Sequence, residues 1–385
     1  MQLSKSWATA LCAVALSFCG VLASATDFAF KPAIKFTDIT RMQLVDITTA
    51  GERLVAVGER GLIVLSDDAG ENWRQAVVPI SATLAAVSFP IPELGWAVGH
   101  SGSILHSKDG GLNWELQFDG VEAGKQYAQY TLSTLERLQT EFDQIEAAIQ
   151  ASPDQGPEAT AQLEDLEYAL EDAIFAEEDA RAALEAGPAD PFLDVLFLDA
   201  STGIAVGAYG MIYRTSDGGE NWLIAADSID NSERFHYYAL AVDAGGHLYL
   251  SGEAGLLYHS GDSGASWDRV EDIYDGSLFG LACEGDYVIA FGLRGNIFRS
   301  ADQGVSWTRI ENPTEYSLYG GTVLPGGGIV LLGSGGAVLQ SNDSGASFTA
   351  YNHPALSTFS AVIEGKGGKL WAVGMNGLDE LGEER

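Results

Sequence analysis

The sequence predicts an all-β protein folded as a seven-bladed β-propeller, with a helical hairpin inserted between blades two and three. Three observations support this prediction: a short motif that recurs six times, a pair of glycines before each copy, and one long segment that lacks both. A repeat of about 40 residues with four short strands per unit is typical of propeller blades. The 46 glycines in 385 residues fit the many tight turns of such a fold.

The recurring motif, here called the Asp box, reads Ser or Thr, any residue, Asp, any residue, Gly, two residues, then an aromatic residue. We expect it to form the turn between the third and fourth strands of a blade, because its Ser and Asp oxygens can accept bonds from nearby amides. Aspartates that recur at the same position of six blades lie far apart, so we assign them a structural role. The copies are Ser66-Asp68-Gly70-Trp73, Ser107-Asp109-Gly111-Trp114, Thr215-Asp217-Gly219-Trp222, Ser260-Asp262-Gly264-Trp267, Ser300-Asp302-Gly304-Trp307 and Ser341-Asp343-Gly345-Phe348.

The glycine pairs mark the turn between the second and third strands. Their first glycines are Gly58, Gly99, Gly207, Gly252, Gly292, Gly333 and Gly374. The intervals between them are 41, 108, 45, 40, 41 and 41 residues, so one insertion follows the second blade. The seventh copy has no Asp box after it. We therefore expect its fourth strand to come from the N-terminal segment near residues 28–36, which would close the ring.

Residues 120–187 have a different composition, rich in Ala, Glu, Leu and Gln. Leu135, Leu138, Phe142, Ile145 and Ile149 follow coiled-coil spacing, as do four apolar residues from Leu163 to Ala173. A Pro- and Gly-containing turn lies between the two runs. We predict a helical hairpin with arms about 40 Å long at 1.5 Å per residue. It should rise from the face of the glycine-pair turns, because the links between blades lie on that face.

The N-terminus resembles a secretory signal peptide: Lys5, an apolar run at residues 11–22, then Ala23-Ser24-Ala25. A lipoprotein signal with Cys19 as the acylated residue is the alternative. The predicted organisation is thus a signal peptide at 1–25, a closing strand with blades one and two at 26–119, the hairpin at 120–187, and blades three to seven at 188–385. We expect a periplasmic or lumenal protein, soluble or peripherally bound to the membrane.

The chemistry-bearing residues do not form an evident catalytic constellation. The histidines are scattered, no His/Cys group has metal-ligand spacing, and no phosphate-binding loop is present, so we predict no enzyme activity, no cofactor and no metal. The net charge of −34 argues against nucleic-acid binding. Asp boxes also occur in sialidases, so the alternative is a sialidase-like or other glycan-active hydrolase or lectin, which would need two carboxylates in a central cleft.

The segments Gly95-Trp96-Ala97-Val98-Gly99 and Ser107-Lys108-Asp109-Gly110-Gly111, followed by Trp114, resemble the photosystem II assembly/stability factor family. The resemblance covers nearly the whole chain outside residues 120–187. It implies a seven-bladed lumenal or periplasmic propeller that acts as a non-enzymatic assembly factor for a membrane protein complex. Photosynthetic members carry an arginine-rich binding face; at the matching turn position this chain has arginine only at Arg60 and Arg294.

The resemblance also implies a protein partner, either a membrane protein or its assembly intermediate. A transporter of the resistance-nodulation-division type is one candidate, and we expect the chain itself to be a monomer. We place the binding surface on the glycine-pair turns and the hairpin. The candidate contact residues are Glu59, Arg60, His100, Tyr209, Glu253, Arg294, Met375 and Asn376.

Overall fold

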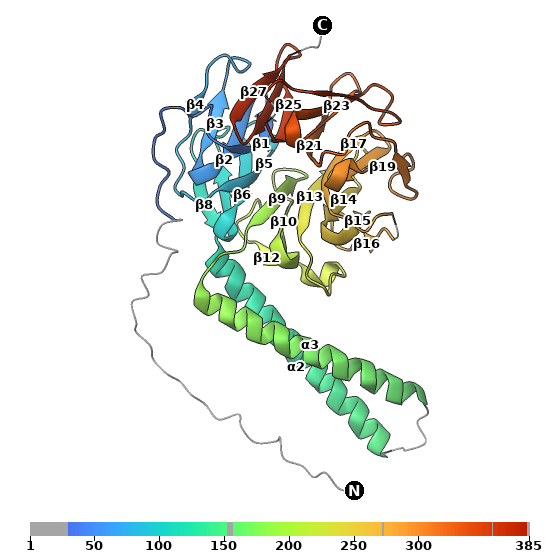
Figure 1. Ribbon diagram of the computed structural model, residues 1–385. Coiled ribbons are helices and arrows are strands. Elements are labelled where there is room, and N and C mark those ends of the chain that lie inside the picture. Colours follow the sequence, from blue (N-terminus) through green and yellow to red (C-terminus); the bar gives the residue numbers. More distant parts are fainter. Residues whose placement is uncertain (1–29, 152–156, 272, 356, 383–385) are drawn as a thin grey trace.

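The computed structural model describes residues 30–151, 157–271, 273–355 and 357–382. Seven antiparallel sheets are arranged in a ring, and a long helical hairpin projects from it (Figure 1). The predicted seven-bladed propeller with its hairpin is therefore confirmed. The signal-peptide prediction concerns residues that lie outside the described part of the chain.

Each of the first six blades contains four consecutive strands, and the seventh contains three. The strands are β1 (Leu44–Ala50), β2 (Arg53–Gly58), β3 (Ile63–Ser66) and β4 (Arg74–Gln75); β5 (Leu84–Ile91), β6 (Leu94–Gly99), β7 (Ser103–Ser107) and β8 (Glu115–Phe118); β9 (Phe192–Phe197), β10 (Gly203–Gly207), β11 (Ile212–Thr215) and β12 (Leu223–Ile224); β13 (Tyr237–Val242), β14 (Leu248–Gly252), β15 (Leu257–Ser260) and β16 (Asp268–Arg269); β17 (Leu278–Glu284), β18 (Tyr287–Gly292), β19 (Ile297–Ser300) and β20 (Thr308–Ile310); β21 (Leu318–Val323), β22 (Ile329–Gly333), β23 (Ala337–Ser341) and β24 (Thr349–Asn352); and β25 (Phe359–Glu364), β26 (Leu370–Gly374) and β27 (Gly377–Leu381).

The first strands of neighbouring blades contact one another all the way round the ring, and β1 meets β25 to close it. The second strands are buried along almost their whole length, as in β10 and β14. Apolar clusters span each pair of adjacent blades; one joins Val57 and Leu65 of blade one to Leu105 and Trp114 of blade two. The core is therefore a series of interfaces between blades, which the aromatic residues of the Asp boxes help to fill.

The Asp boxes share one set of hydrogen bonds, seen in blade one. Ser66 Oγ accepts the Gly70 N–H at 2.8 Å, and Asp68 Oδ1 accepts the Asn72 N–H at 2.8 Å. Gly70 has φ of +90°, a conformation that L side chains rarely adopt. Bonds from the Asn72 side chain and backbone lower the pKa of Asp68 to about 2. These bonds explain the aspartates as turn-forming residues.

The predicted closing strand near residues 28–36 is not formed in its described part, residues 30–36, and the seventh sheet has three strands. This segment lies instead along blade one, where the Ala33 N–H donates to Val78 O and the Gln75 side chain bonds Phe36 N and Ile34 O. Pro32 has no N–H to donate to a ladder. The segment reaches blade seven only later, where the Leu378 N–H donates to Thr40 O.

Beside blade seven, side-chain packing adds to this backbone bond in place of a fourth strand. Phe36, Ile39 and Met42 pack in one cluster with Val373 and Leu378, so the N-terminal segment still ties the two ends of the described chain together. The prediction that residues 28–36 complete blade seven is therefore wrong for the described residues; the ring closes where β1 meets β25, and the contacts with blade seven come from residues 36–42.

The hairpin consists of α2 (Gly120–Ala151) and α3 (Pro157–Ala186), which lie side by side (Figure 1). Leu166, Leu170 and Ala173 are buried between them, in agreement with the predicted spacing. The hairpin leaves the ring beside the turn between β6 and β7, where Gly120 packs against Ser101 and Gly102. No helix in the described ranges is long and apolar enough to cross a membrane.

Candidate binding face

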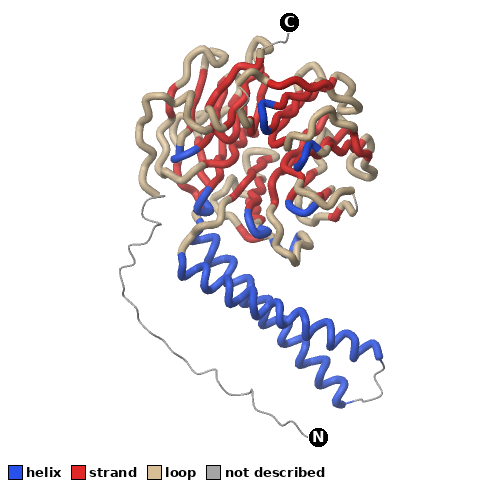
Figure 2. Tube along the Cα trace, viewed as in Figure 1, coloured by secondary structure: helices blue, strands red, loops and turns tan. Residues whose placement is uncertain are grey.

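The turns between second and third strands are short 3-10 helices in six blades, spread round the ring as short blue segments in Figure 2. In each, the middle residue has a positive φ, as at Arg60 and Tyr209. We call the side of the ring that carries these turns the turn face. The helices are η1 (Glu59–Gly61), η2 (His100–Gly102), η3 (Ala208–Gly210), η5 (Glu253–Gly255), η6 (Leu293–Gly295) and η7 (Ser334–Gly336).

All eight candidate contact residues lie on the turn face, in the turns of six blades. Arg60, His100, Tyr209, Arg294, Met375 and Asn376 are exposed. Glu59 and Glu253 are half-buried, and their carboxylates accept backbone N–H groups, from Gln43 at 3.2 Å and from His236 at 3.2 Å. These two glutamates therefore anchor the residue that comes just before the first strand, Gln43 in blade one and His236 in blade four.

A row of aromatic rings crosses the turn face from blade three to blade six. Tyr209 contacts His236 with ring centroids 4.7 Å apart, and its N–H donates to His236 Nδ1 at 2.8 Å. His236 is followed by Tyr238 at 6.3 Å, Phe279 at 5.3 Å and Tyr319 at a further 5.3 Å. Tyr209 is 51% exposed and Tyr319 37% exposed. We call these five residues the aromatic row.

The aromatic row follows from the position of its residues in the first strands. Tyr238, Phe279 and Tyr319 are each the second residue of β13, β17 and β21. The first strands of adjacent blades are in contact, so residues at one strand position form a continuous line. The other blades have Val45, Ala85, Leu193 and Ser360 at this position, so first-strand aromatics occur here only in blades four to six, and Tyr209 extends the row into blade three.

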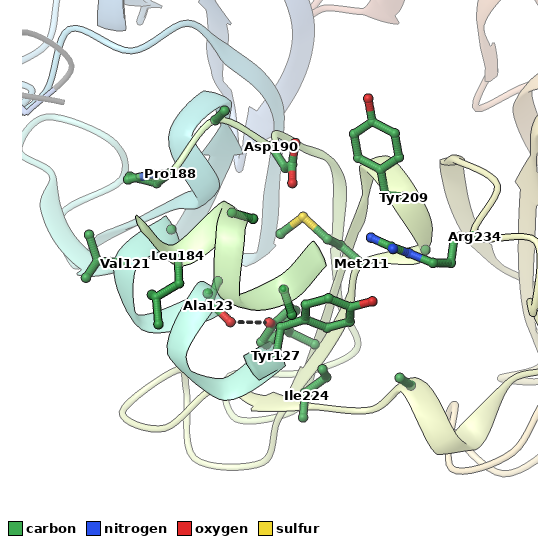
Figure 3. A pocket seen from close by; sticks show the side chains of 18 of the residues that line it. Val121, Ala123, Tyr127, Leu184, Pro188, Asp190, Tyr209, Met211, Ile224 and Arg234 are labelled. Carbon is green, nitrogen blue, oxygen red and sulfur yellow. Dashed lines mark hydrogen bonds between the residues drawn. The ribbon is translucent and has the colours of Figure 1, made fainter. Parts of the chain in front are cut away.

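An open groove of about 280 Å³ lies where the hairpin meets blade three, and it begins at Tyr209 (Figure 3). Its walls are mostly apolar. They come from α2, from α3, from η3 and β11, and from the strand β12; Val121, Leu184, Met211 and Ile224 contribute the larger aliphatic side chains. Small residues on both helices, such as Gly124 and Ala183, leave the space open.

The base of the hairpin is fixed to blade three by polar bonds. Tyr213 Oη donates to Ala123 O at 2.9 Å, and Gln126 bonds both Trp222 O and the Ile224 N–H. Tyr130 Oη donates to Asp227 at 2.9 Å, and burial together with this aspartate raises the pKa of Tyr130 to about 12. These bonds hold the groove walls in place.

One cation and two carboxylates surround the mouth of the groove. Arg234 lies over the Tyr127 ring at 5.3 Å and its Nη1 is 3.9 Å from Asp179 Oδ2. Arg234 also has φ of +54°, an uncommon conformation for a residue with a side chain. Asp190 points into the same space (Figure 3), where partial burial raises its pKa and the charges of Arg234 and His236 oppose that rise.

Two aspartates lie on first strands, at equivalent positions of blades one and three. Asp46 accepts the Ile47 and Val87 N–H groups, and Asp194 accepts those of Val195 and Leu240. Burial raises the pKa of Asp46 to about 6 and that of Asp194 to about 7. Each carboxylate links its own blade to the next one, so we assign this pair a structural role in the ring. In the described part of the chain, no group of three or more His, Cys, Asp or Glu side chains could hold a metal ion.

The structure adds residues that the sequence had not singled out. His236, Tyr238, Phe279 and Tyr319 join Tyr209, and Arg234 and Tyr127 frame the groove. The row had a signal in the sequence, an aromatic residue at one repeat position in three successive blades. The groove had no signal in the sequence, because it depends on how the hairpin packs against blade three.

The chain matches the family model described as photosynthesis system II assembly factor YCF48 over residues 65–141 and 175–308, which is more than half of its length. It is 37% identical over 78 residues to the photosystem II assembly lipoprotein Ycf48 of Synechococcus sp. (strain CC9902). That alignment spans 20% of this chain and only 23% of the curated relative.

Solved structures share the fold. A structure of YCF48 bound to a D1 peptide has a TM-score of 0.58 and 16% identity, with 90% of this chain and 97% of that chain covered. YCF48 from Cyanidioschyzon merolae has a TM-score of 0.57 and 15% identity, with 91% and 97% covered. The WD40 propeller domain of Doa1 has a TM-score of 0.59 and 13% identity, with 93% and 97% covered.

Proposed function

The chain belongs to the photosynthesis system II assembly factor YCF48 family, and on that premise we propose that it is a non-enzymatic binding protein for a segment of a membrane protein undergoing assembly. The observation that supports this most is the aromatic row, which leaves Tyr209 and Tyr319 exposed on a rigid ring of backbone. Aromatic residues are enriched where proteins bind one another, because each ring contributes a large contact area. A solved member of the family is bound to a D1 peptide, which supports a peptide segment as the ligand.

We place the binding surface on the turn face and assign its centre to the aromatic row and its edge to the hairpin. Of the eight turn residues predicted from the sequence, Tyr209 belongs to the aromatic row, and we assign the other seven to the surface around it. We propose a periplasmic or lumenal location, in keeping with the predicted signal peptide. The transporter of the resistance-nodulation-division type as partner and the monomeric state both stay predictions.

The experiment is affinity capture from detergent-solubilised membranes of the source organism with the full chain as bait. We expect a membrane protein to be retained by the wild-type protein and lost with the variant Tyr238→Ala/Phe279→Ala/Tyr319→Ala. The matched control is Val305→Ala, since Val305 is 84% exposed in the Asp box of blade five. Capture that the triple variant retains, or that Val305→Ala abolishes, would overturn this placement.

A further inference from the structure

The groove at the base of the hairpin has the size and surface of a side-chain pocket. Its volume of about 280 Å³ lies just below the range of about 300–1,000 Å³ that drug-sized ligands occupy. That space suits one bulky apolar side chain. Met211, Ile224 and Leu184 line it, and Tyr209 connects it to the aromatic row (Figure 3).

The charged residues at the groove determine which residues are favoured next to that apolar side chain in a bound segment. Arg234 is already engaged, because it stacks on Tyr127 and lies 3.9 Å from Asp179. Asp190 makes no ion pair within 4.0 Å among the described residues. An incoming ammonium or guanidinium group could pair with Asp190 and lie against Tyr209, whereas an incoming carboxylate would add to an anionic rim.

The charge of the two helices that form the groove also favours a cationic segment. Together α2 and α3 carry fifteen acidic and three basic residues, so the arm beside the groove attracts a cationic segment. A second copy of this chain would bring the same acidic arm against it. The charge pattern therefore favours a basic partner over self-association.

We propose that this groove is an anchoring pocket for a bulky apolar side chain flanked by lysine or arginine in an extended partner segment. The apolar side chain enters between α2, α3 and β11, and the adjacent cation pairs with Asp190. This inference rests on the proposed function, since it specifies the chemistry of the segment that the turn face holds. In this proposal the two helices of the hairpin contact the bound segment directly.

The test measures fluorescence anisotropy of three end-blocked, fluorescein-labelled nonapeptides with the full-length protein. The probe has Lys-Phe-Lys at its centre, and its twins have Glu-Phe-Glu and Lys-Ala-Lys, all flanked by Gly and Ser. We expect the wild-type protein to bind the Lys-Phe-Lys probe at least tenfold more tightly than either twin. Equal dissociation constants for the three peptides, or no binding of the Lys-Phe-Lys probe, would overturn the proposal.

Two variants and one control locate the binding in the groove. Ala183→Trp places an indole where Ala183 lines the groove, and it should remove the preference for Phe over Ala. The control Ala182→Trp changes the preceding residue, which is also exposed but does not line the groove, and it should retain that preference. Asp190→Asn should reduce the preference for Lys over Glu at least threefold. Melting curves establish that each variant is folded. An Ala183→Trp protein that binds as the wild type refutes the pocket, and membrane capture by the wild type still tests the proposed function separately.

Discussion

The hydroxyl of each Asp box is the residue-scale feature on which the blade turns depend. Ser300 is fully buried, accepts the Gly304 N–H at 2.8 Å and donates to Asp302 at 2.8 Å. The sequence alone predicts this role, because the motif repeats in register and its oxygens lie within reach of their own backbone. It does not predict the aromatic row to the same degree, since Tyr238 and Phe279 are also ordinary strand residues.

Removing one such hydroxyl should destabilise its blade. Ser300→Ala leaves the buried Gly304 N–H without its acceptor, so we expect a loss of about 1–3 kcal/mol in the free energy of unfolding. Ser300→Thr is the control, because Thr215 makes the same bonds in blade three. Urea unfolding followed by tryptophan fluorescence measures both; an alanine variant as stable as the threonine variant would contradict this role.

Asp46 and Asp194 make the stability of the ring depend on pH. Their pKa values of about 6 and about 7 lie above the unfolded value of about 4, so the folded state binds protons more readily. Their contribution is therefore most favourable below pH 4 and is lost as the pH rises through 6 and 7. We expect the melting temperature to fall between pH 5 and pH 8.

The control replaces both aspartates by the residue that other blades carry. Ala86, Ala239 and Ala361 occupy the equivalent strand position, so Asp46→Ala/Asp194→Ala should keep the strand geometry and flatten the decline between pH 5 and pH 8. A double variant whose melting temperature falls as steeply as that of the wild type would show that other groups cause the decline. The opposite dependence belongs to Asp68, Asp262 and Asp343, whose pKa values of about 2 place their loss of stability below pH 4.

At the scale of elements, the hairpin and the N-terminal segment differ in how far the sequence predicts them. Heptad spacing and a breaker-rich turn identify α2 and α3, and strand alternation places them on the turn face. The attachment to blade three depends on single contacts such as Tyr213 with Ala123, which no periodicity reveals. Likewise, hydrophobic residues at positions 30–36 suggest a strand of blade seven. In the structure, however, the Ala33 N–H in this segment donates to Val78 O beside blade one.

The hairpin should be separable from the ring. Gly120 and Pro188 are in contact, so residues 122–186 can be replaced by a short Gly-Ser linker without moving the flanking strands. We expect a folded propeller with an unchanged far-ultraviolet β signal that captures the membrane partner poorly, because the groove has lost two of its walls. Capture at the wild-type level would contradict the hairpin's share in binding.

At the scale of the whole molecule, the ring separates two faces. The Asp boxes lie on one face, where they form the turns between third and fourth strands. The hairpin, the groove and the aromatic row lie on the other face. The period of about 40 residues predicts the number of blades, because each blade needs a neighbour to bury its apolar surface. The same repetition explains why the binding face is less predictable, since it depends on how the blades differ from one another.

Site-specific photo-crosslinking tests the binding face most directly. A photo-reactive phenylalanine analogue is introduced separately at Tyr209, at Tyr319 and at Val305, and the full-length proteins are irradiated with solubilised membranes. We predict adducts to one membrane protein from Tyr209 and Tyr319 and none from Val305. Adducts to that protein from Val305 alone would place binding on the Asp-box face and contradict the account.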